Sequence, residues 1–293
     1  MRHEGPPVET DADLARAIDS IADRFDGRLG VFLCVPRGAD AFDVLHSRNA
    51  DEEFVAASVI KLPILYALYE AYDGELDRLG EPRPIAAENR VGGSGILHLF
   101  DDPTSTLEDL ARAMIAISDN TATNQLIDEL GADRIERTAA RLGMDDTRLR
   151  RKMMATLGEN DFEPLGEQLE GRPANATTPA DCARFFADLV HEATLSAPAY
   201  ERLRVPLDEQ KDRSLFPRYL PYRTPIAHKT GGLPTAALDA GVLRSADADP
   251  SPLVFSAFAT RAENGGDAGD AVAAVGEVAF ERVTSQGQEY CGG

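Results

Sequence analysis

The stretch AASVIKLPIL, residues 56–65, sets one serine and one lysine into a run that is otherwise apolar. Lysine is scarce in this chain, at four residues against 26 arginines, so a lysine in such a setting is unusual. Ser58 and Lys61 stand at i and i+3, a spacing that places both side chains on one face of a helix. The stretch therefore predicts an apolar helix with Ser58 at its N-terminus and an amine within reach of the serine hydroxyl.

This pair has the chemistry of an activated nucleophile. A serine hydroxyl is a poor nucleophile until a neighbouring base takes its proton. A lysine is such a base only if burial and nearby cations lower its pKa, and the apolar neighbours of Lys61 supply the burial. The helix N-terminus also puts the backbone N–H of Ser58 where an oxyanion would form. The pattern favours acyl transfer with Ser58 as the nucleophile.

The motif SDN, Ser118–Asn120, follows between two predicted helices. By itself it is an ordinary polar turn. Combined with a nucleophilic serine, Ser118 would relay a proton to the leaving nitrogen of a substrate, and Asn120 would hold a substrate amide. Ser118 is therefore a candidate catalytic residue and Asn120 a candidate substrate-binding residue.

The motif KTG, Lys229–Gly231, contains another of the four lysines and by itself is the end of a strand. Lys229 would supply the second positive charge that lowers the pKa of Lys61, and together with Thr230 it would hold a substrate carboxylate. Gly232, just past the motif, would offer the oxyanion a second backbone N–H. The remaining candidate substrate-binding residues are Lys229, Thr230, Gly231 and Gly232.

Helical and strand patterns alternate along the chain in an informative order. Helices are expected over 11–25, through much of 53–145, over 178–193 and over 266–283. Strands are expected over 28–37, 41–47, 225–230, 238–244 and 253–260, the first two forming a hairpin. Residues 155–179 show no sustained period and are expected to form one long loop, of a length that is usually functional or disordered.

Sheet segments near both ends of the chain can pair only if the helical block is an insertion between them. We expect a mixed α/β (α+β) fold with an antiparallel sheet flanked by the N- and C-terminal helices. Residues 1–52 and 206–293 would form the sheet domain, and residues 53–205 an inserted all-α domain. The active site is expected in the cleft between them, because such junctions commonly hold ligands.

Helix-end signals give finer expectations. Thr104 or Ser105 precedes acidic residues and an apolar period, which is typical of an N-cap. Gly131 is expected to end the helix that follows the SDN motif. Thr177 or Thr178 is expected to cap the helix that Pro179 opens.

Composition excludes several classes of protein. A net charge of −20 argues against nucleic-acid binding, because contacts with phosphates depend on basic patches. No apolar run reaches the roughly 18 residues of a membrane span, and the N-terminus lacks an apolar signal core, so a cytoplasmic protein is expected, with export left open. The abundance of acids beside few lysines resembles proteins of salt-loving organisms; an ordinary acidic surface is the alternative.

Three cysteines, Cys34, Cys182 and Cys291, have no C-x-x-C spacing and form an odd count, which argues against a disulfide framework and a zinc site. We expect two packed thiols and one tail residue, no metal and no cofactor. Nothing in the sequence predicts a partner other than a small substrate, so we expect a monomer.

With these motifs in this order, the chain resembles the class A β-lactamase type of serine hydrolase, in the superfamily that includes the penicillin-binding proteins. The segments GGSGILHLF at 92–100, SDNTATNQLIDELG at 118–131 and NATTPAD at 175–181 also look like that family. The resemblance extends from the first predicted helix to the last. It implies the β-lactamase/transpeptidase-like fold and a β-lactam carbonyl attacked by Ser58, with the acyl-enzyme then hydrolysed by water.

The resemblance also implies a glutamate on the long loop that activates the deacylating water. Glu163, followed by Pro164, matches the Glu-Pro element of the family, although the usual downstream asparagine is absent. The same loop carries Glu159, Glu167 and Glu170, and a solvated surface glutamate is the alternative interpretation. The segment GLPTAALDAGVL, 232–243, lacks the arginine with which many class A enzymes hold the substrate carboxylate.

Three functions are compatible with the pattern. The first is a β-lactamase with full turnover. The second is a DD-peptidase or esterase-like hydrolase of the same superfamily, which the absence of a readable signal peptide favours. The third is a penicillin-binding module that is acylated at Ser58 and scarcely deacylates, which would require Glu163 to be misplaced.

Overall fold

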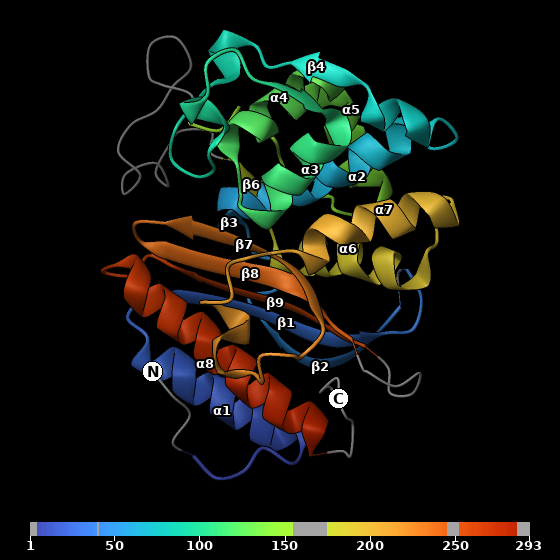
Figure 1. Ribbon diagram of the computed structural model, residues 1–293. Helices are drawn as coiled ribbons and strands as arrows, with labels where there is room; N and C mark the ends of the chain where they lie inside the picture. Colours follow the sequence, from blue (N-terminus) through green and yellow to red (C-terminus); the bar gives the residue numbers. More distant parts are fainter. Residues whose placement is uncertain (1–4, 40, 155–174, 245–251, 286–293) are drawn as a thin grey trace.

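The structure is a computed structural model that describes residues 5–39, 41–154, 175–244 and 252–285. One five-stranded antiparallel sheet lies between two groups of helices (Figure 1). Its strands, in spatial order, are β2 (Phe42–Arg48), β1 (Arg28–Pro36), β9 (Leu253–Thr260), β8 (Ala236–Leu243) and β7 (Ile226–Leu233). The expected antiparallel sheet is confirmed, and β7, which carries the KTG motif, is one of its edges.

Strand β1 alternates its side chains between two cores, as the two-residue period of a strand requires. Leu29, Val31 and Leu33 pack into the core on one face, whereas Phe32 and Cys34 pack into the core on the other. Both faces of the sheet are therefore covered, which explains why its strands are apolar runs with little alternation in sequence.

The first face is covered by the two terminal helices, α1 (Asp11–Arg24) and α8 (Gly265–Thr284), together with the 3₁₀ turn η5 (Phe216–Tyr219) (Figure 1). Leu14, Ile18 and Ile21 of α1 are buried at the predicted helical spacing. Thr10 caps this helix: its hydroxyl oxygen accepts the backbone N–H of Asp13, and the Asp13 carboxylate accepts the backbone N–H of Thr10. The flanking of the sheet by the terminal helices is confirmed.

The second face is covered by α6 (Pro179–His191), which belongs to a larger helical layer. Its other long members are α2 (Lys61–Ala71), α3 (Leu107–Ala116), α4 (Asn120–Leu130), α5 (Ala132–Arg141) and α7 (Ala197–Asp208). Every residue of α2 from Lys61 to Tyr69 is buried, so this helix is the centre of the layer rather than an amphipathic surface helix.

The helical layer is less uniformly helical than its sequence predicts. Residues 72–106 form the turns η2 (Leu76–Gly80), η3 (Ala87–Asn89) and η4 (Leu97–Leu99), and a two-stranded pair of β4 (Pro82–Pro84) and β5 (Thr104–Thr106). A second short pair joins β3 (Phe54–Val55) to β6 (Ala176–Thr177). Glycines and prolines in this part of the chain favour turns over a continuous helix.

Helix ends agree with expectation at two sites and differ at a third. Gly131 ends α4 with a φ of 77°, and Thr178 caps α6 ahead of Pro179. The cap of α3 is Thr106, which accepts the backbone N–H of Asp109, and not Thr104 or Ser105. Those two residues belong to β5, whose pairing with β4 delays the start of the helix.

Helix α7 was not expected, because residues 197–208 contain two prolines and many charged residues. Its buried residues Ala199, Tyr200, Leu203 and Leu207 nevertheless follow a helical period. The predicted boundary after residue 205 falls inside this helix, and the division into residues 1–52 with 206–293 and 53–205 remains a prediction.

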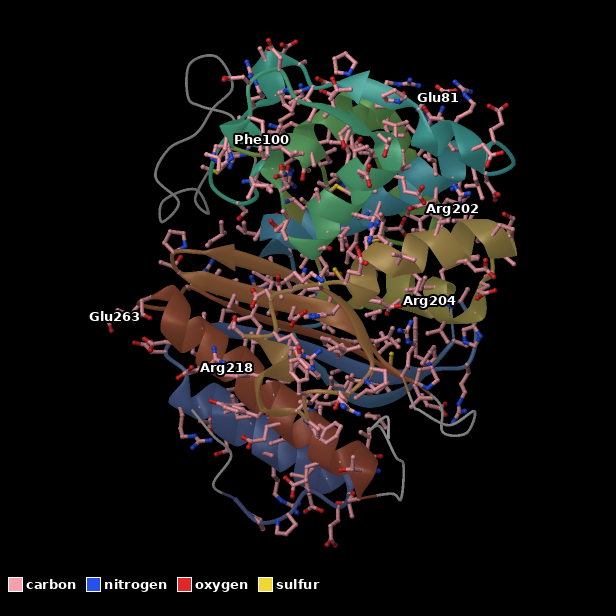
Figure 2. All side chains as sticks on the ribbon, in the orientation of Figure 1. Glu81, Phe100, Arg202, Arg204, Arg218 and Glu263 are labelled. Carbon is pink, nitrogen blue, oxygen red and sulfur yellow. The ribbon has the colours of Figure 1, made fainter. Side chains whose placement is uncertain are left out.

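The surface is charged over both groups of helices. Glu81, Arg202 and Arg204 lie on the helical layer, and Glu263 lies next to the start of α8 on the other side of the sheet (Figure 2). Cys34 and Cys182 are buried and free, as expected, whereas Cys291 lies outside the described residues. In the described part of the chain, no helix is long and apolar enough to cross a membrane.

Candidate active site

Ser58 lies in η1 (Ala57–Ile60), a 3₁₀ turn that leads directly into α2. Ala57 before it has a φ of 43°, so the backbone turns sharply just ahead of the serine. Strand β7 packs tightly on this turn: a Cβ on Gly231 would lie 3.1 Å from the backbone nitrogen of Ser58. Glycine at that position therefore allows β7 to approach the turn. Among the described residues, the Ser58 hydroxyl has no hydrogen-bond partner.

Lys61 is the first residue of α2 and its side chain is fully buried. Its Nζ contacts Ser118 O at 2.8 Å, Ser118 Oγ at 3.1 Å and Asn120 Oδ1 at 2.9 Å. Burial lowers the pKa of Lys61 well below its usual value, and the positive charge of Lys229 lowers it further. A neutral amine keeps all three contacts, donating to the two carbonyl oxygens and accepting from the Ser118 hydroxyl.

Ser118 lies in the short connection between α3 and α4, and Asn120 is the first residue of α4. Ser118 has a φ of 58°, a left-handed conformation that aims its hydroxyl and its carbonyl at Lys61. Asn120 accepts from Lys61 and donates through Nδ2 to Gly92 O at 3.0 Å. The α3–α4 connection and the first residue of α4 thus hold both side chains against the amine.

Asp119, between these two residues, organises the connection. One carboxylate oxygen accepts the backbone N–H of Ala122 and caps α4, and the other accepts the N–H groups of Ile96 and Leu97. The sequence prediction assigned Asp119 no role. An aspartate directly before an apolar helix is an N-cap signal that indicates the first of these bonds.

Lys229 in β7 is the second buried amine of the site. Its Nζ donates to Ser118 Oγ at 3.2 Å and to Thr230 O at 2.6 Å. Burial lowers its pKa to about 7, against the opposing effect of the Asp239 and Asp212 carboxylates. The Ser118 hydroxyl therefore joins two amines from different elements, α2 and β7.

Behind the KTG strand lies a buried pair that the sequence prediction missed. His228 Nδ1 and Asp239 Oδ1 are 2.9 Å apart, and the other oxygen of Asp239 accepts the backbone N–H of Phe216 at 3.2 Å. Burial raises the pKa of Asp239, and His228 opposes that shift. The pair ties β7 and β8 to η5, and no short-range sequence pattern indicates it.

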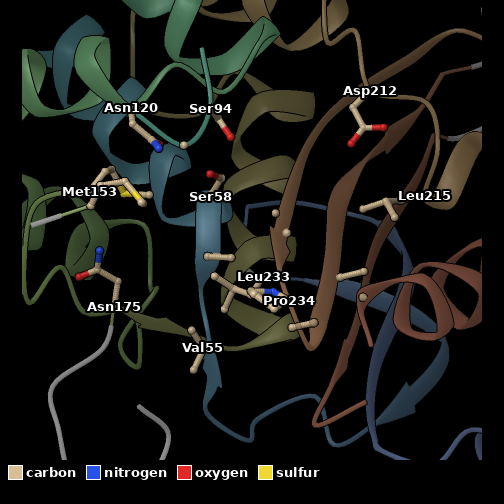
Figure 3. A pocket seen from close by; sticks show the side chains of 18 of the residues that line it. Val55, Ser58, Ser94, Asn120, Met153, Asn175, Asp212, Leu215, Leu233 and Pro234 are labelled. Carbon is tan, nitrogen blue, oxygen red and sulfur yellow. The ribbon is translucent and has the colours of Figure 1, made fainter. Parts of the chain in front are cut away.

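A cavity of about 580 Å³ opens beside these groups (Figure 3). Ser58, Asn120, Gly231 and Gly232 line it, whereas Lys61 and Lys229 are buried behind the lining. Thr230 lies in β7 between Lys229 and Gly231 and is 5% exposed. Much of the remaining wall is apolar and consists of Val55, Met153, Met154, Leu215, Leu233 and Pro234.

Two asparagines hold the wall segment that contains Met153. Asn124 Oδ1 accepts the N–H of Met153 at 2.7 Å and its Nδ2 donates to the carbonyl of the same residue. Asn175 Oδ1 accepts the N–H groups of Arg150 and Arg151. These positions were not predicted as site residues, because an asparagine that holds the backbone across the fold has no local signature.

The predicted loop glutamates Glu159, Glu163, Glu167 and Glu170 all lie outside the described residues. The remaining predicted residues converge from η1 and α2, from the α3–α4 connection and the start of α4, and from β7. Within the described ranges, no three or more histidine, cysteine or acidic side chains gather as a metal site would require.

Comparisons with known proteins agree with this arrangement. The family model described as "Beta-lactamase enzyme family" matches residues 13–283. Beta-lactamase CTX-M-97 of Escherichia coli is 32% identical over 165 residues, which are 56% of this chain and 52% of that protein. A beta-lactamase of Streptomyces fradiae is 30% identical over 218 residues, 71% of this chain and 65% of that protein. The first of these matches spans about half the length of the curated relative.

Solved structures agree over more of the chain. The crystal structure of a beta-lactamase from Sphaerobacter thermophilus has a TM-score of 0.78 and 29% sequence identity to this chain. The alignment covers 92% of this chain and 97% of that one. The similarity therefore includes both the sheet with its terminal helices and the helical layer.

Proposed function

Because the chain belongs to the beta-lactamase enzyme family, we propose that it is a serine β-lactamase that opens the β-lactam amide through an acyl-enzyme on Ser58. The observation that carries this proposal is the position of the Ser118 hydroxyl. It lies 3.1 Å from Nζ of Lys61 and 3.2 Å from Nζ of Lys229, next to the cavity that Ser58 lines. Acyl transfer from nitrogen requires a nucleophile, an amine with a lowered pKa and a hydroxyl that bridges between them and the leaving nitrogen.

In the acylation step, Ser58 Oγ attacks the β-lactam carbonyl carbon and its proton passes to a base. We assign that role to Lys61, because burial and the neighbouring charge of Lys229 lower its pKa well below the usual value and so favour the neutral, basic form of the amine. The proton then moves from Lys61 through Ser118 to the ring nitrogen as the amide bond breaks. The 3.1 Å contact between Lys61 Nζ and Ser118 Oγ supports this route.

The oxyanion of the tetrahedral intermediate needs hydrogen-bond donors in place before the reaction. We assign these to the backbone N–H groups of Ser58 and Gly232, both of which line the cavity. Asn120 would hold the substrate amide, while Lys229 and Thr230 would hold its carboxylate. Gly231 would serve by its small size, since it lets β7 lie against the serine turn.

Deacylation requires a base that activates water. Glu163, with Pro164 after it, remains our candidate for that base on the family resemblance. If Glu163 is misplaced, the acyl-enzyme persists and the protein acts as a penicillin-binding module. If instead the site prefers another acyl group, the protein is a DD-peptidase or esterase-like hydrolase.

One experiment separates these functions: mixing the protein with a chromogenic cephalosporin while following colour and intact mass. A β-lactamase gives sustained colour with many turnovers per protein. A penicillin-binding module gives one stable adduct on Ser58 and no further colour. A protein that shows neither is not a β-lactamase, and peptide and ester substrates then test the remaining alternative.

The serine variant is the control on mechanism. Ser58→Ala should lose at least about a thousandfold in kcat and form no adduct, because the nucleophile is gone. Ser47→Ala, on the exposed strand β2, removes a hydroxyl of the same kind far from the motifs and should retain activity. Full activity in Ser58→Ala would refute the proposed mechanism.

A further inference from the structure

One charged side chain lies on the sheet side of the cavity. The wall that β7, β8, the turn between them and the loop before η5 contribute consists of glycine, alanine, leucine and proline, with Asp212 of that loop as its single ionisable residue among those described. The other charged lining residues, Arg151 and Lys152, lie on the wall that contains Met153. Figure 3 shows Asp212 on the same side as Leu215, across the cavity from Asn175.

Hydrogen bonds fix Asp212 in this place. Lys211 donates its backbone N–H to Ala116 O at 2.9 Å, and Gln210 Nε2 donates to Ile115 O at 2.9 Å. The loop is thereby attached to the end of α3, shortly before Ser118. Asp212 Oδ1 accepts both the N–H and the hydroxyl of Ser214, at 2.9 and 2.6 Å. Its Oδ2 accepts no hydrogen bond from any described residue. Because Asp212 is exposed and lines the cavity, this oxygen is accessible to a ligand.

The carboxylate of Asp212 interacts electrostatically with the amine of Lys229, whose pKa it raises against the effect of burial. Lys229 is the residue assigned to a substrate carboxylate, and it is only partly charged at neutral pH, since burial lowers its pKa to about 7. Strands β7 and β8 contain no arginine. The two cations next to Asp212 in sequence, Lys211 and Arg213, do not line the cavity, and the Arg213 guanidinium lies 5.7 Å from the ring centroid of Tyr222.

A lone anionic substrate group would therefore meet weak attraction and a fixed negative charge at this end of the cavity. We propose that Asp212 is a specificity-determining residue that selects β-lactams carrying a positive charge next to the ring carboxylate, such as cephalosporins with a cationic C3 substituent. The cation would lie beside Asp212 Oδ2 while the carboxylate lies toward Lys229. This inference rests on the proposed β-lactamase function.

The test compares two cephalosporins with the same thienylacetyl side chain: cephaloridine, with a pyridinium group at C3, and cephalothin, with a neutral acetoxy group there. The measured quantity is the ratio of their kcat/KM values, or of their acylation rate constants by intact mass if turnover is absent. Asp212→Asn should lower the ratio of cephaloridine to cephalothin about fivefold, as expected for one partly screened charge. Asparagine keeps the Oδ1 acceptor for Ser214, so the loop should stay in place.

Two further variants and a salt series make the test specific. Asp212→Glu keeps the charge and should keep most of the ratio. Asp101→Asn removes an exposed aspartate that does not line the cavity, changes the net charge equally and should leave the ratio unchanged. The difference between wild type and Asp212→Asn should shrink in about 1 M NaCl, because salt screens exposed charges.

The outcomes are distinguishable. Acylation of Ser58 by both compounds with a ratio that Asp212→Asn does not change overturns the role of Asp212 alone. An equal fall of the ratio in Asp101→Asn overturns it too, because the effect would then be one of net charge. No acylation by either compound overturns the proposed function, and this inference with it.

Discussion

At the scale of single residues, the site depends on two amines that share one hydroxyl. Lys61 and Lys229 both contact Ser118 Oγ, and both are fully buried. Two protonated amines that contact the same hydroxyl oxygen repel each other strongly in a low-dielectric interior. The pair therefore favours a state in which only one of the two amines is protonated. One lysine can then serve as a base while the other carries the charge, which is the division of roles that the proposed mechanism needs.

This sharing gives a pH dependence with a definite sign. Lys229 is charged below its pKa of about 7 and neutral above it. For a cephalosporin whose only charge is its carboxylate, kcat/KM should therefore fall as pH rises through about 7, by up to about tenfold per unit. The profile is to be measured from about pH 6 to about pH 9 on wild type and on Lys229→Arg.

Arginine remains charged throughout that range, so Lys229→Arg should lose the alkaline decline even if its activity is lower. A wild-type profile that stays flat across the range would contradict the assignment of Lys229. A decline of the same shape in Lys229→Arg would place the titrating group elsewhere.

The residue roles were predictable from the sequence to different degrees. The i, i+3 spacing and the apolar neighbours of Lys61 predicted its burial, because both are local properties of a helix. That its bonds go to Ser118 and Asn120 depends on how α4 packs on α2, which no local pattern indicates. The pair of His228 and Asp239 was missed for the same reason, since the two residues meet only through the register of β7 and β8.

At the scale of the elements, Asp119 connects a helix to the cavity wall. Its carboxylate caps α4 through Ala122 and also accepts the N–H groups of Ile96 and Leu97, which follow the cavity-lining Gly93 and Ser94. One buried side chain thus holds both the start of α4 and the segment that contains Ile96 and Leu97. Its loss should affect stability and the site together.

Asp119→Ala should lower the free energy of unfolding by about 3 kcal/mol, because a helix cap is lost and two further N–H groups lose their acceptor. Urea unfolding measures this change, and kcat/KM should fall in parallel because the wall at Gly93 and Ser94 is released. Thr106→Ala is the comparison: it removes only the exposed cap of α3 and should cost about 1 kcal/mol. Equal losses in the two variants would show that the bonds to Ile96 and Leu97 contribute nothing.

The elements themselves were mostly predictable where the pattern was long and regular. The terminal helices, the first hairpin and the last three strands occur where the apolar periods place them. Helix α7 was missed because its prolines resemble a loop, although Pro198 occupies the first turn, where it is tolerated. The irregular stretch from 72 to 106 was predicted as helix because its short apolar groups imitate a helical period.

At the scale of the whole molecule, charge is the dominant feature. The chain carries 50 acidic residues against 30 basic ones. Surface pairs such as Arg204 with Glu192, at 3.0 Å, and Arg218 with Asp270 offset a part of the acidic charge (Figure 2). Exposed pairs of this kind contribute little to stability. The repulsion that results from the net charge of −20 therefore has the larger effect on the free energy of unfolding.

Salt should therefore stabilise the protein. Raising NaCl from about 0.1 M to about 1 M shortens the screening length from about 10 Å to about 3 Å, and the melting temperature should rise by about 5 °C. Glycerol at matched osmolality screens no charge and serves as the control. A melting temperature that stays constant or falls with NaCl would contradict the prediction, and with it the likeness to proteins of salt-loving organisms.

The pairing of β1 with β9 sets the order in which the chain acquires its structure during synthesis. Arg28 of the first strand lies opposite Thr260 of the last, so most of the chain separates two neighbours in the sheet. The ribosome must release the entire helical layer before the centre of the sheet can close, and until then the β1–β2 hairpin exposes an unpaired edge. Until β9 has been synthesised, the free edge of β1 lacks its partner strand, and an unpaired strand edge of this kind favours aggregation.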